Sequence, residues 1–358
     1  MTGSRRATSH APPALVEVTR GGRVESVHRG SIAVVAPDGS PIVSVGDPEQ
    51  FAFTRSSAKP FQLAPFVASG RFDEYGLGPD ALAIMAASHS GEDRHVRLVQ
   101  EILRRAGLTS AVLQNQVHAP YDTETAQRLL RDGEKPTALR GNCSGKHAGM
   151  ILFAKASGWP IDSYWHPDHP VQRQALETIS ALSDVLIEEI ATGVDGCGVV
   201  CFGMPIRGLA TAFARLADPA AVADPLLRSA LTRIRDAMMA HPELVAGTSR
   251  RIDTALMAAY PARVVSKGGA EGVQAMGLPP ASLSKEAPFG DGPLGIAATI
   301  EDGNWARRAG DQVGVELLRQ LGLATDPLPR PLHEFAEPPI VDPRGESAGG
   351  VRPAFRLT

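Results

Sequence analysis

Residues 55–62 read Arg-Ser-Ser-Ala-Lys-Pro-Phe-Gln, a stretch that places a hydroxyl and an amine three residues apart where a helix begins. Pro60 has no N–H, and its ring would clash with the carbonyl of Ser56 inside a helix, so the helix must begin near Ser57. Side chains three residues apart lie on one helix face. The spacing therefore predicts Ser56 and Lys59 as neighbours at a helix N-terminus.

A serine and a lysine at this spacing can form a nucleophile and its base. A serine hydroxyl needs a base at neutral pH, and a lysine can serve if burial or a second cation lowers its pKa. The N–H groups and the positive dipole end of the helix would stabilise the oxyanion formed during attack on a carbonyl. Only two positions are fixed, and by itself the pattern favours an N-cap serine followed by a solvated lysine.

Composition and charge exclude several classes of protein. The chain has 358 residues, 43% hydrophobic and 21% charged, which is typical of a globular protein. A formal charge of -3 without a basic run argues against nucleic acid or an anionic membrane as partner. No stretch approaches the ~18 apolar residues that span a bilayer, and the N-terminus lacks a secretory apolar run. We expect a cytoplasmic protein with a mobile leader at residues 1–13 and a single domain at residues 14–358.

The N-terminal region alternates apolar and polar residues between turn formers, which predicts strands. Turns at Gly21-Gly22 and Asp38-Gly39 predict an antiparallel meander across residues 16–45. We expect its last strand to run towards Phe51 and Phe53 and to deliver the chain to the serine–lysine motif.

Helical spacing predicts helices through the middle of the chain, and apolar runs predict further strands near its end. The predicted helices cover residues 62–67, 91–103, 123–132, 148–156, 209–216, 226–239 and 305–321, with another starting at Pro170. Residues 199–202, 264–265, 295–300 and 350–355 are predicted strands, and residues 241–251 a loop. We expect an α+β fold: an antiparallel sheet closed by both terminal segments, with flanking helices and a helical middle region.

Four further polar clusters associated with glycine lie at predicted element ends, where catalytic groups and ordinary turns both concentrate. They are Ser88-His89-Ser90-Gly91-Glu92, Gly141-Asn142-Cys143-Ser144-Gly145-Lys146-His147, Asp195-Gly196-Cys197-Gly198 and Ser266-Lys267-Gly268-Gly269. In the first, Ser90 is the predicted N-cap of the next helix. Ser88 and His89 would then lie in the turn before that helix.

The glycine loop at residues 141–146 differs from a nucleotide-binding P-loop. Three residues rather than four separate its glycines, and His147 stands where a P-loop carries the magnesium-binding hydroxyl. The loop retains only the anion-binding capacity of a helix N-terminus.

The three cysteines are too few and too scattered for a disulfide framework. Cys143 shares a loop with Lys146, and Cys197 lies in another loop, so two thiolates could bind zinc if the fold brought these loops together. A lysine ligand must be neutral and is uncommon, and the residues alone favour small buried cysteines instead.

The five motifs, in this order, resemble those of the rhizobial-type L-asparaginases, relatives in fold of the serine β-lactamases, penicillin-binding proteins and glutaminases. The motifs are Arg-Ser-Ser-Ala-Lys-Pro-Phe-Gln, Ala-Ser-His-Ser-Gly-Glu, Gly-Asn-Cys-Ser-Gly-Lys-His-Ala-Gly-Met, Asp-Gly-Cys-Gly and Ser-Lys-Gly-Gly-Ala-Glu-Gly. The resemblance extends from about residue 15 to residue 355. It implies a homodimer that hydrolyses L-asparagine to L-aspartate and ammonia.

The resemblance also implies roles for individual residues. Two serine–lysine pairs would perform catalysis, Ser56 with Lys59 and Ser88 with Lys267. Zinc would bind Cys143, Lys146 and Cys197, supporting substrate affinity and site shape rather than supplying the nucleophile. Two lysines in one pocket repel each other's protons, so one of them can be neutral near pH 7 and act as base.

A zwitterionic substrate needs opposite charges around it. We expect Arg55 and His147 to face its α-carboxylate and Asp195 its ammonium, although each of the three could instead form a structural salt bridge. Ser56 is the expected nucleophile, and the sequence leaves open an exchange of roles with Ser88. The alternatives are another Ser-Lys amidohydrolase, glutaminase or β-lactamase-like, and a non-catalytic amino-acid or zinc-binding protein on the same fold.

Overall fold

The computed structural model describes residues 11–304 and 309–358, and most of its strands belong to one large sheet. The leader predicted at residues 1–13 therefore lies largely outside the described residues. The strands of the large sheet are β1 (Ala14–Arg20), β2 (Arg23–Val35), β3 (Pro41–Val45), β7 (Val265–Ser266), β8 (Val273–Leu278), β9 (Leu294–Ile300), β10 (Pro339–Val341) and β11 (Ser347–Pro353). A second sheet contains β4 (Phe51–Phe53), β5 (Ala191–Val194) and β6 (Val200–Pro205).

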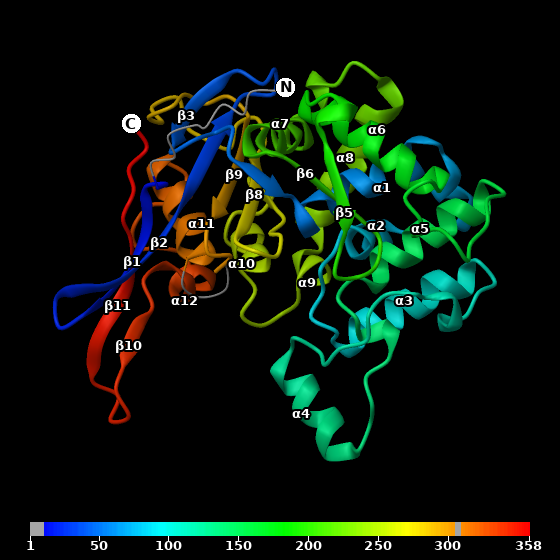
Figure 1. Cartoon of the computed structure of the whole chain (residues 1–358), viewed down its shortest axis with the longest axis horizontal. Coiled ribbons are helices and arrows are strands. Elements are labelled where there is room, and N and C mark those ends of the chain that lie inside the picture. The colour runs from blue at the N-terminus through cyan, green and yellow to red at the C-terminus, as the bar shows by residue number, and fades with distance from the viewer. Residues whose placement is uncertain (1–10, 305–308) are drawn as a thin grey trace, which may run out of the picture.

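The large sheet is antiparallel, and segments from the two ends of the chain lie side by side in it (Figure 1). Its strands follow the order β10-β11-β1-β2-β9-β8-β7, with β3 also paired to β2. Val16 lies opposite Pro353 and Val18 opposite Val351, so β1 and β11 close the sheet. The predicted α+β architecture is confirmed.

The N-terminal meander is confirmed as far as β3, but β4 has a different partner from the one expected. Phe51 pairs with Pro205 and Phe53 with Gly203, so β4 belongs to the smaller sheet. Local alternation marks a strand without specifying its neighbour, because pairing depends on cross-strand contacts from distant residues. The chain thus leaves the large sheet just before the serine–lysine motif.

Most of the helices cover the smaller sheet and one face of the larger one (Figure 1). In the described residues they are α1 (Lys59–Ala68), α2 (Pro79–Met85), α3 (Asp93–Arg105), α4 (Thr123–Asp132), α5 (Ser144–Ala156), α6 (Pro170–Ser183), α7 (Ile206–Ala217), α8 (Pro225–Ala240), α9 (Pro242–Val245), α10 (Ile252–Ala259), α11 (Gly310–Gln320) and α12 (His333–Ala336). The helices predicted at residues 123–132, 209–216 and 226–239 are confirmed as α4, α7 and α8.

Alternate residues of β2 fill two hydrophobic cores on opposite faces of the large sheet. Ala33 and Val35 face the core that includes α7 and the helical region. Ile32 and Val34 face the core that includes α11. This is the period of two expected for a strand buried on both faces. The closing helix α11 packs on the sheet as predicted, although residues 305–308 of its expected span lie outside the described part.

Helix α3 begins two residues later than predicted. Its N-cap is Glu92, whose side chain and His95 form a reciprocal capping box. The predicted cap, Ser90, instead donates its hydroxyl to the carbonyl of Ala246. The prediction was wrong because a tertiary contact takes the hydroxyl that a local cap would use.

The predicted loop at residues 241–251 contains the short helix α9. All three cysteines are free and buried. None of the helices in the described residues is both long and apolar enough to cross a membrane.

Gly295 provides a test of how α7 packs on the sheet. A Cβ atom at this position would lie 1.9 Å from the carbonyl oxygen of Ala210 on α7, whereas one at Gly292 would meet nothing within 4 Å. Because backbone atoms cannot rotate away, we expect Gly295→Ala to destabilise the protein by about 1–3 kcal/mol. Gly292→Ala should change stability by less than about 0.5 kcal/mol, measured by urea unfolding. Equal midpoints for the two variants would contradict this packing.

Candidate active site

The serine–lysine motif occupies a turn followed directly by helix α1. Arg55–Ala58 form a 3₁₀ turn, and the backbone N–H of Lys59 donates to the carbonyl of Ser56. Pro60 lies in the first turn of α1, as predicted. The Lys59 side chain is fully buried, so the alternative of a solvated lysine is wrong. Ser56 remains half-buried at the mouth of the helix.

The amine of Lys59 joins three segments that are distant in sequence. Its Nζ donates to the carbonyl of Ala87 (2.5 Å), to Ser88 Oγ (2.7 Å) and to Cys143 Sγ (3.2 Å). None of the hydrogen bonds described for this amine goes to Ser56. Three acceptors match the three protons of an ammonium, but burial outweighs them and lowers the pKa of Lys59.

The turn that carries Ser88 is held by backbone and side-chain contacts on several sides. The N–H of Ser88 donates to the carbonyl of Val245 (2.9 Å). Its carbonyl accepts from Nη2 of Arg251 (2.8 Å). The ring of His89 is buried, and its Nε2 lies 2.9 Å from Ser144 Oγ. This hydrogen bond connects the turn to the start of α5. The Ser88 hydroxyl is therefore fixed beside Lys59.

Lys267 follows strand β7, and its side chain is only 1% exposed. Nζ donates to the carbonyl of Gly268 (2.6 Å) and lies 3.9 Å from Oδ2 of Asp253. Burial, opposed by Asp253 and reinforced by repulsion from Lys59, lowers the pKa of Lys267 to about 7. The fold thus places Lys267, whose pKa is near neutral pH, close enough to Lys59 for the two amines to affect each other's protonation.

The predicted zinc ligands also converge. Lys146 Nζ donates to Cys197 Sγ (3.0 Å) and lies 3.7 Å from Oδ2 of Asp195. A hydrogen bond between the thiols and the nearby Lys146 lower the pKa of Cys197 to about 5. The same hydrogen bond, together with burial, raises the pKa of Cys143 to about 12. One thiolate and one thiol therefore share a proton beside an ammonium.

This cluster offers donors of mixed type. Within residues 11–304 and 309–358, no three His, Cys, Asp or Glu side chains are grouped so as to hold a metal ion. Two sulfur atoms and one amine nitrogen do meet, and all three would need to be in their deprotonated forms to bind zinc. The thiolate character of Cys197 fits that requirement, and the charged Lys146 would have to change state.

Two predicted substrate-binding residues pair with each other. Nε of Arg55 donates to Oδ1 of Asp195 (2.9 Å). Burial opposes ionisation of Asp195, but Lys146, Lys59 and Arg55 outweigh it and hold the pKa of this carboxyl well below its usual range. Arg55 adopts a left-handed backbone conformation with φ 48°, which is strained for a residue with a side chain. Their roles towards substrate remain predictions.

His147 is fully buried behind the cluster. Its Nδ1 lies 2.6 Å from the hydroxyl of Tyr164, and no partner for Nε2 is found among the described atoms. Burial, with repulsion from Lys146, lowers the pKa of His147 to about 3. The ring is neutral at pH 7, so any contact with the substrate carboxylate would be a hydrogen bond rather than an ion pair.

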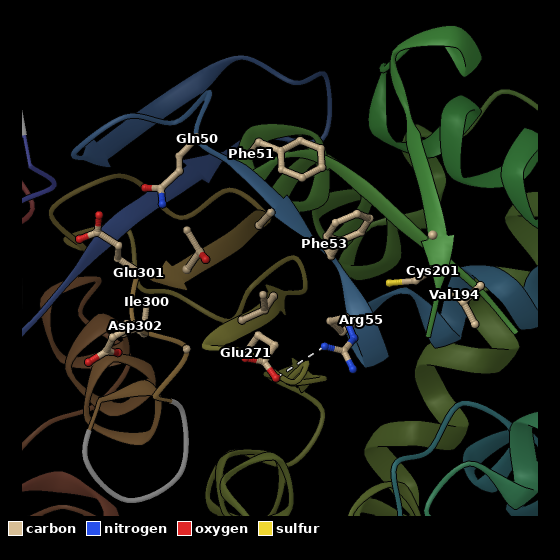
Figure 2. Close-up of a pocket in the computed structure, with 15 residues that line it drawn as sticks. Gln50, Phe51, Phe53, Arg55, Val194, Cys201, Glu271, Ile300, Glu301 and Asp302 are labelled. Atoms are coloured by element: carbon tan, nitrogen blue, oxygen red, sulfur yellow. Dashed lines mark ion pairs between the residues drawn. The ribbon is translucent and has the colours of Figure 1, made fainter. Parts of the chain in front are cut away.

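A pocket of about 500 Å³ opens beside Arg55 (Figure 2). Phe51 and Phe53 meet edge to face with ring centroids 5.3 Å apart, and both are substantially exposed. Oε1 of Glu271 lies 3.8 Å from Nη1 of Arg55, and the dashed line in Figure 2 marks this ion pair. Of the residues predicted for the site, only Arg55 lines this pocket.

The sequence pointed to the five motifs but missed residues that support them. Glu271 lies within the last motif and has φ 57°, and its place in that motif was the available signal. Arg251 and Asp253 contact the turns of Ser88 and Lys267 from outside every motif. No local pattern distinguishes these two from ordinary residues at a helix start.

One family model matches nearly the whole chain. The family model described as L-asparaginase II matches residues 16–353. No curated protein matches the chain in sequence.

Solved structures show distant likenesses. A Bacillus glutaminase is 15% identical, with 81% of this chain and 90% of that chain covered and a TM-score of 0.37. A probable glutaminase of Bacillus subtilis is 13% identical, with 82% and 88% covered and a TM-score of 0.38. A β-lactamase of Mycobacterium bovis is 14% identical, with 82% and 95% covered and a TM-score of 0.43. From the family model, which spans almost the whole chain, the chain belongs to the L-asparaginase II family.

Proposed function

We propose that this amidohydrolase converts L-asparagine and water to L-aspartate and ammonia through a serine acyl-enzyme. The family model supports the amide substrate. The observation that carries the chemistry is the 2.7 Å contact between Lys59 Nζ and Ser88 Oγ, which joins two predicted serine–lysine motifs into one site.

The two buried lysines supply the base. The positive charge on one lysine makes it harder for the other lysine to keep its proton. This repulsion, together with burial, lowers the pKa of Lys267 to about 7. Loss of one proton from this pair near pH 7 leaves one neutral amine and one charged amine. The neutral amine accepts a proton from the attacking serine, while the charged amine orients the second hydroxyl.

The nucleophile in this proposal is Ser56, as expected from its position one helical turn before Lys59. The Ser56 oxygen bonds to the carboxamide carbon while the hydroxyl proton passes to the neutral amine of the lysine pair. The C–N bond then breaks, and the nitrogen leaves as ammonia after taking up a proton. Water attacks the ester, which releases L-aspartate and restores the serine hydroxyl.

The position of Ser88 supports a role in moving the proton. Its hydroxyl accepts a hydrogen bond from Lys59 and is fixed by its backbone neighbours. A hydroxyl held against an ammonium can receive that proton and donate its own to the leaving nitrogen. The same contact supports the exchanged assignment, in which Ser88 becomes acylated.

The charged groups of the substrate would bind to Arg55 and Asp195, which form an ion pair with each other in the free protein. Arg55 and Asp195 neutralise each other at 2.9 Å. A bound zwitterion can take both partners, with its α-carboxylate on Arg55 and its ammonium on Asp195, so no charge is left buried alone. His147 would add a neutral hydrogen bond to the α-carboxylate.

Zinc, if bound, would be held by Cys143, Lys146 and Cys197. When bound, it would replace the shared proton and fix the geometry of the loops next to Asp195. It would thereby support substrate affinity, and the nucleophile would remain the serine hydroxyl. A homodimer in the cytoplasm remains the expectation drawn from the resemblance.

A second candidate keeps the same chemistry with another amide, either glutamine or a β-lactam. A non-catalytic protein that binds an amino acid or zinc is the third. Release of ammonia from asparagine and glutamine, together with hydrolysis of a chromogenic lactam, separates these possibilities. Binding of asparagine to Ser56→Ala and Ser88→Ala without turnover by the unmodified protein would identify a binding protein.

Removal of the nucleophile tests the serine assignment. We expect Ser56→Ala to lower kcat for ammonia release on the order of 10³-fold or more, because no other group forms the acyl bond. A trapped acyl adduct should map to Ser56 by mass spectrometry. Ser180→Ala is the matched control, since it removes a hydroxyl that donates to the carbonyl of Val185 far from the site. An adduct on Ser88 would reverse the assignment.

The lysine pair predicts the pH dependence of turnover. Because a neutral amine is required and the pKa of Lys267 is lowered to about 7, kcat/KM should rise as pH increases through about 7. Lys267→Arg keeps its proton at every working pH, so we expect loss of this rise together with most activity. The exposed Lys135→Arg should retain the wild-type profile. A rate that falls across the same range would show that the charged form is required.

Metal content tests the thiol cluster. We expect purified protein to contain near-stoichiometric zinc, with Cys143→Ser losing the metal and raising KM more than it lowers kcat. Cys201→Ser is the control, because Cys201 is also a buried free thiol. Plasma mass spectrometry measures the zinc content, and calorimetry measures substrate affinity. Wild-type protein without zinc that keeps its full substrate affinity would contradict the zinc assignment.

A further inference from the structure

The first residues of α10 contact both turns that carry catalytic groups. Arg251 immediately precedes the helix, and Asp253 lies in its first turn. Nη2 of Arg251 donates to the carbonyl of Ser88 (2.8 Å), and Nη1 donates to Ser90 Oγ (3.0 Å). One guanidinium therefore fixes the Ser88 turn at two points.

Asp253 holds the chain on both sides of Lys267. Its carboxylate, in a side chain only 3% exposed, accepts from Ser266 Oγ (2.7 Å) and from the N–H of Gly268 (2.9 and 3.0 Å). Nε2 of Gln274 donates to the same oxygen as Ser266 (3.3 Å). The residues before and after Lys267 thus share one buried acceptor.

Sheet pairing alone holds Lys267 at few points. Strand β7 has only two residues, pairing Val265 with Gly277 and Ser266 with Met276. The N–H of Lys267 adds one bond to the carbonyl of Ala275 (3.0 Å). A short edge strand frays readily, so side-chain anchors are needed to fix the direction of the amine.

We propose that Arg251 and Asp253 are positioning residues, and that the start of α10 sets the separation and orientation of Ser88 and Lys267. This inference rests on the proposed serine–lysine function. Arg251 has no described contact with the Lys59 or Lys267 amine or with the Ser56 or Ser88 hydroxyl, and Asp253 comes no nearer to them than the 3.9 Å between its Oδ2 and Lys267 Nζ. Each acts through a group of the site, Arg251 through the Ser88 carbonyl and Asp253 through the residues that flank Lys267.

The charges around Lys267 distinguish positioning from simple packing. Asp253 and Arg251 face its amine from the start of α10, Lys59 faces it from α1, and Cys143 from the turn before α5. Asp311 of α11 faces Asp253, and burial together with that charge raises the pKa of Asp311 to about 8. Asp253 favours the protonated form of Lys267, so its removal lowers the pKa of Lys267 further.

Asp253→Asn tests this arrangement, because it keeps the shape of the side chain and removes its charge. We expect kcat to fall about 10–100-fold with KM within about twofold, as for other residues that orient a functional group. The acid limb of the pH profile should move to lower pH. Asp184→Asn is the matched control, since it breaks the remote ion pair with Arg215 and should leave the limb in place.

A second variant covers the case in which Asp253→Asn does not fold. Arg251→Lys retains a cation but not the two-point contact, so we expect a similar loss in kcat, and Arg251→Met should lose more activity. Loss of activity in Asp253→Asn without any displacement of the acid limb would overturn the proposal. Unchanged kcat in Arg251→Lys would also overturn it.

A crystal structure of Asp253→Asn or Arg251→Lys separates this inference from the proposed function. In Asp253→Asn we expect the turn that carries Lys267 to shift relative to the turn that carries Ser88. In Arg251→Lys we expect the turn that carries Ser88 to shift relative to the turn that carries Lys267. If wild-type protein releases no ammonia from any amide, the proposed function fails, and a shifted turn still supports the positioning role. Both turns in their wild-type places would overturn the positioning role whatever the activity.

Discussion

The buried amine of Lys59 is the constraint on which the rest of the site depends. A charge without water needs an acceptor for each proton, and here the acceptors come from Ala87, Ser88 and Cys143. No segment of one helix could supply all three. The start of α1, the turn before α3 and the turn before α5 must therefore lie next to one another.

Charge balance links this amine to the neighbouring thiols. Lys146 lies beside Cys197 and Asp195, and Arg55 pairs with Asp195 from the opposite side. Lys146 and Arg55 thus each have Asp195 as an opposite charge within 4 Å. Lys267 differs, because its nearest described carboxylate lies at 3.9 Å, and burial leaves its pKa near 7. Burial lowers the pKa of Lys59 as well, so the two amines of the serine–lysine pairs are the buried cations most ready to exchange a proton.

Local sequence predicted the elements whose signals are local. Pro60 placed the start of α1, helical periodicity located α4 and α8, and alternation identified β1, β2 and β3. Predictions were wrong where a distant partner decided the outcome. Ser90 makes a tertiary hydrogen bond instead of capping α3, and Phe51–Phe53 pair with β6 instead of extending the meander. Both cases show tertiary contacts overriding a local preference.

The amino-acid sequence by itself determined the chemical inventory of the site: the serines, lysines and cysteines, their order, and the family to which their motifs point. It also determined where helices begin, because proline and glycine restrict the backbone locally. Only the tertiary structure decided that Lys59 bonds to Ser88, that Arg55 pairs with Asp195, and that Arg251 and Asp253 hold two turns. These contacts join residues far apart in the chain, and no local conformational preference specifies which distant groups share a buried charge.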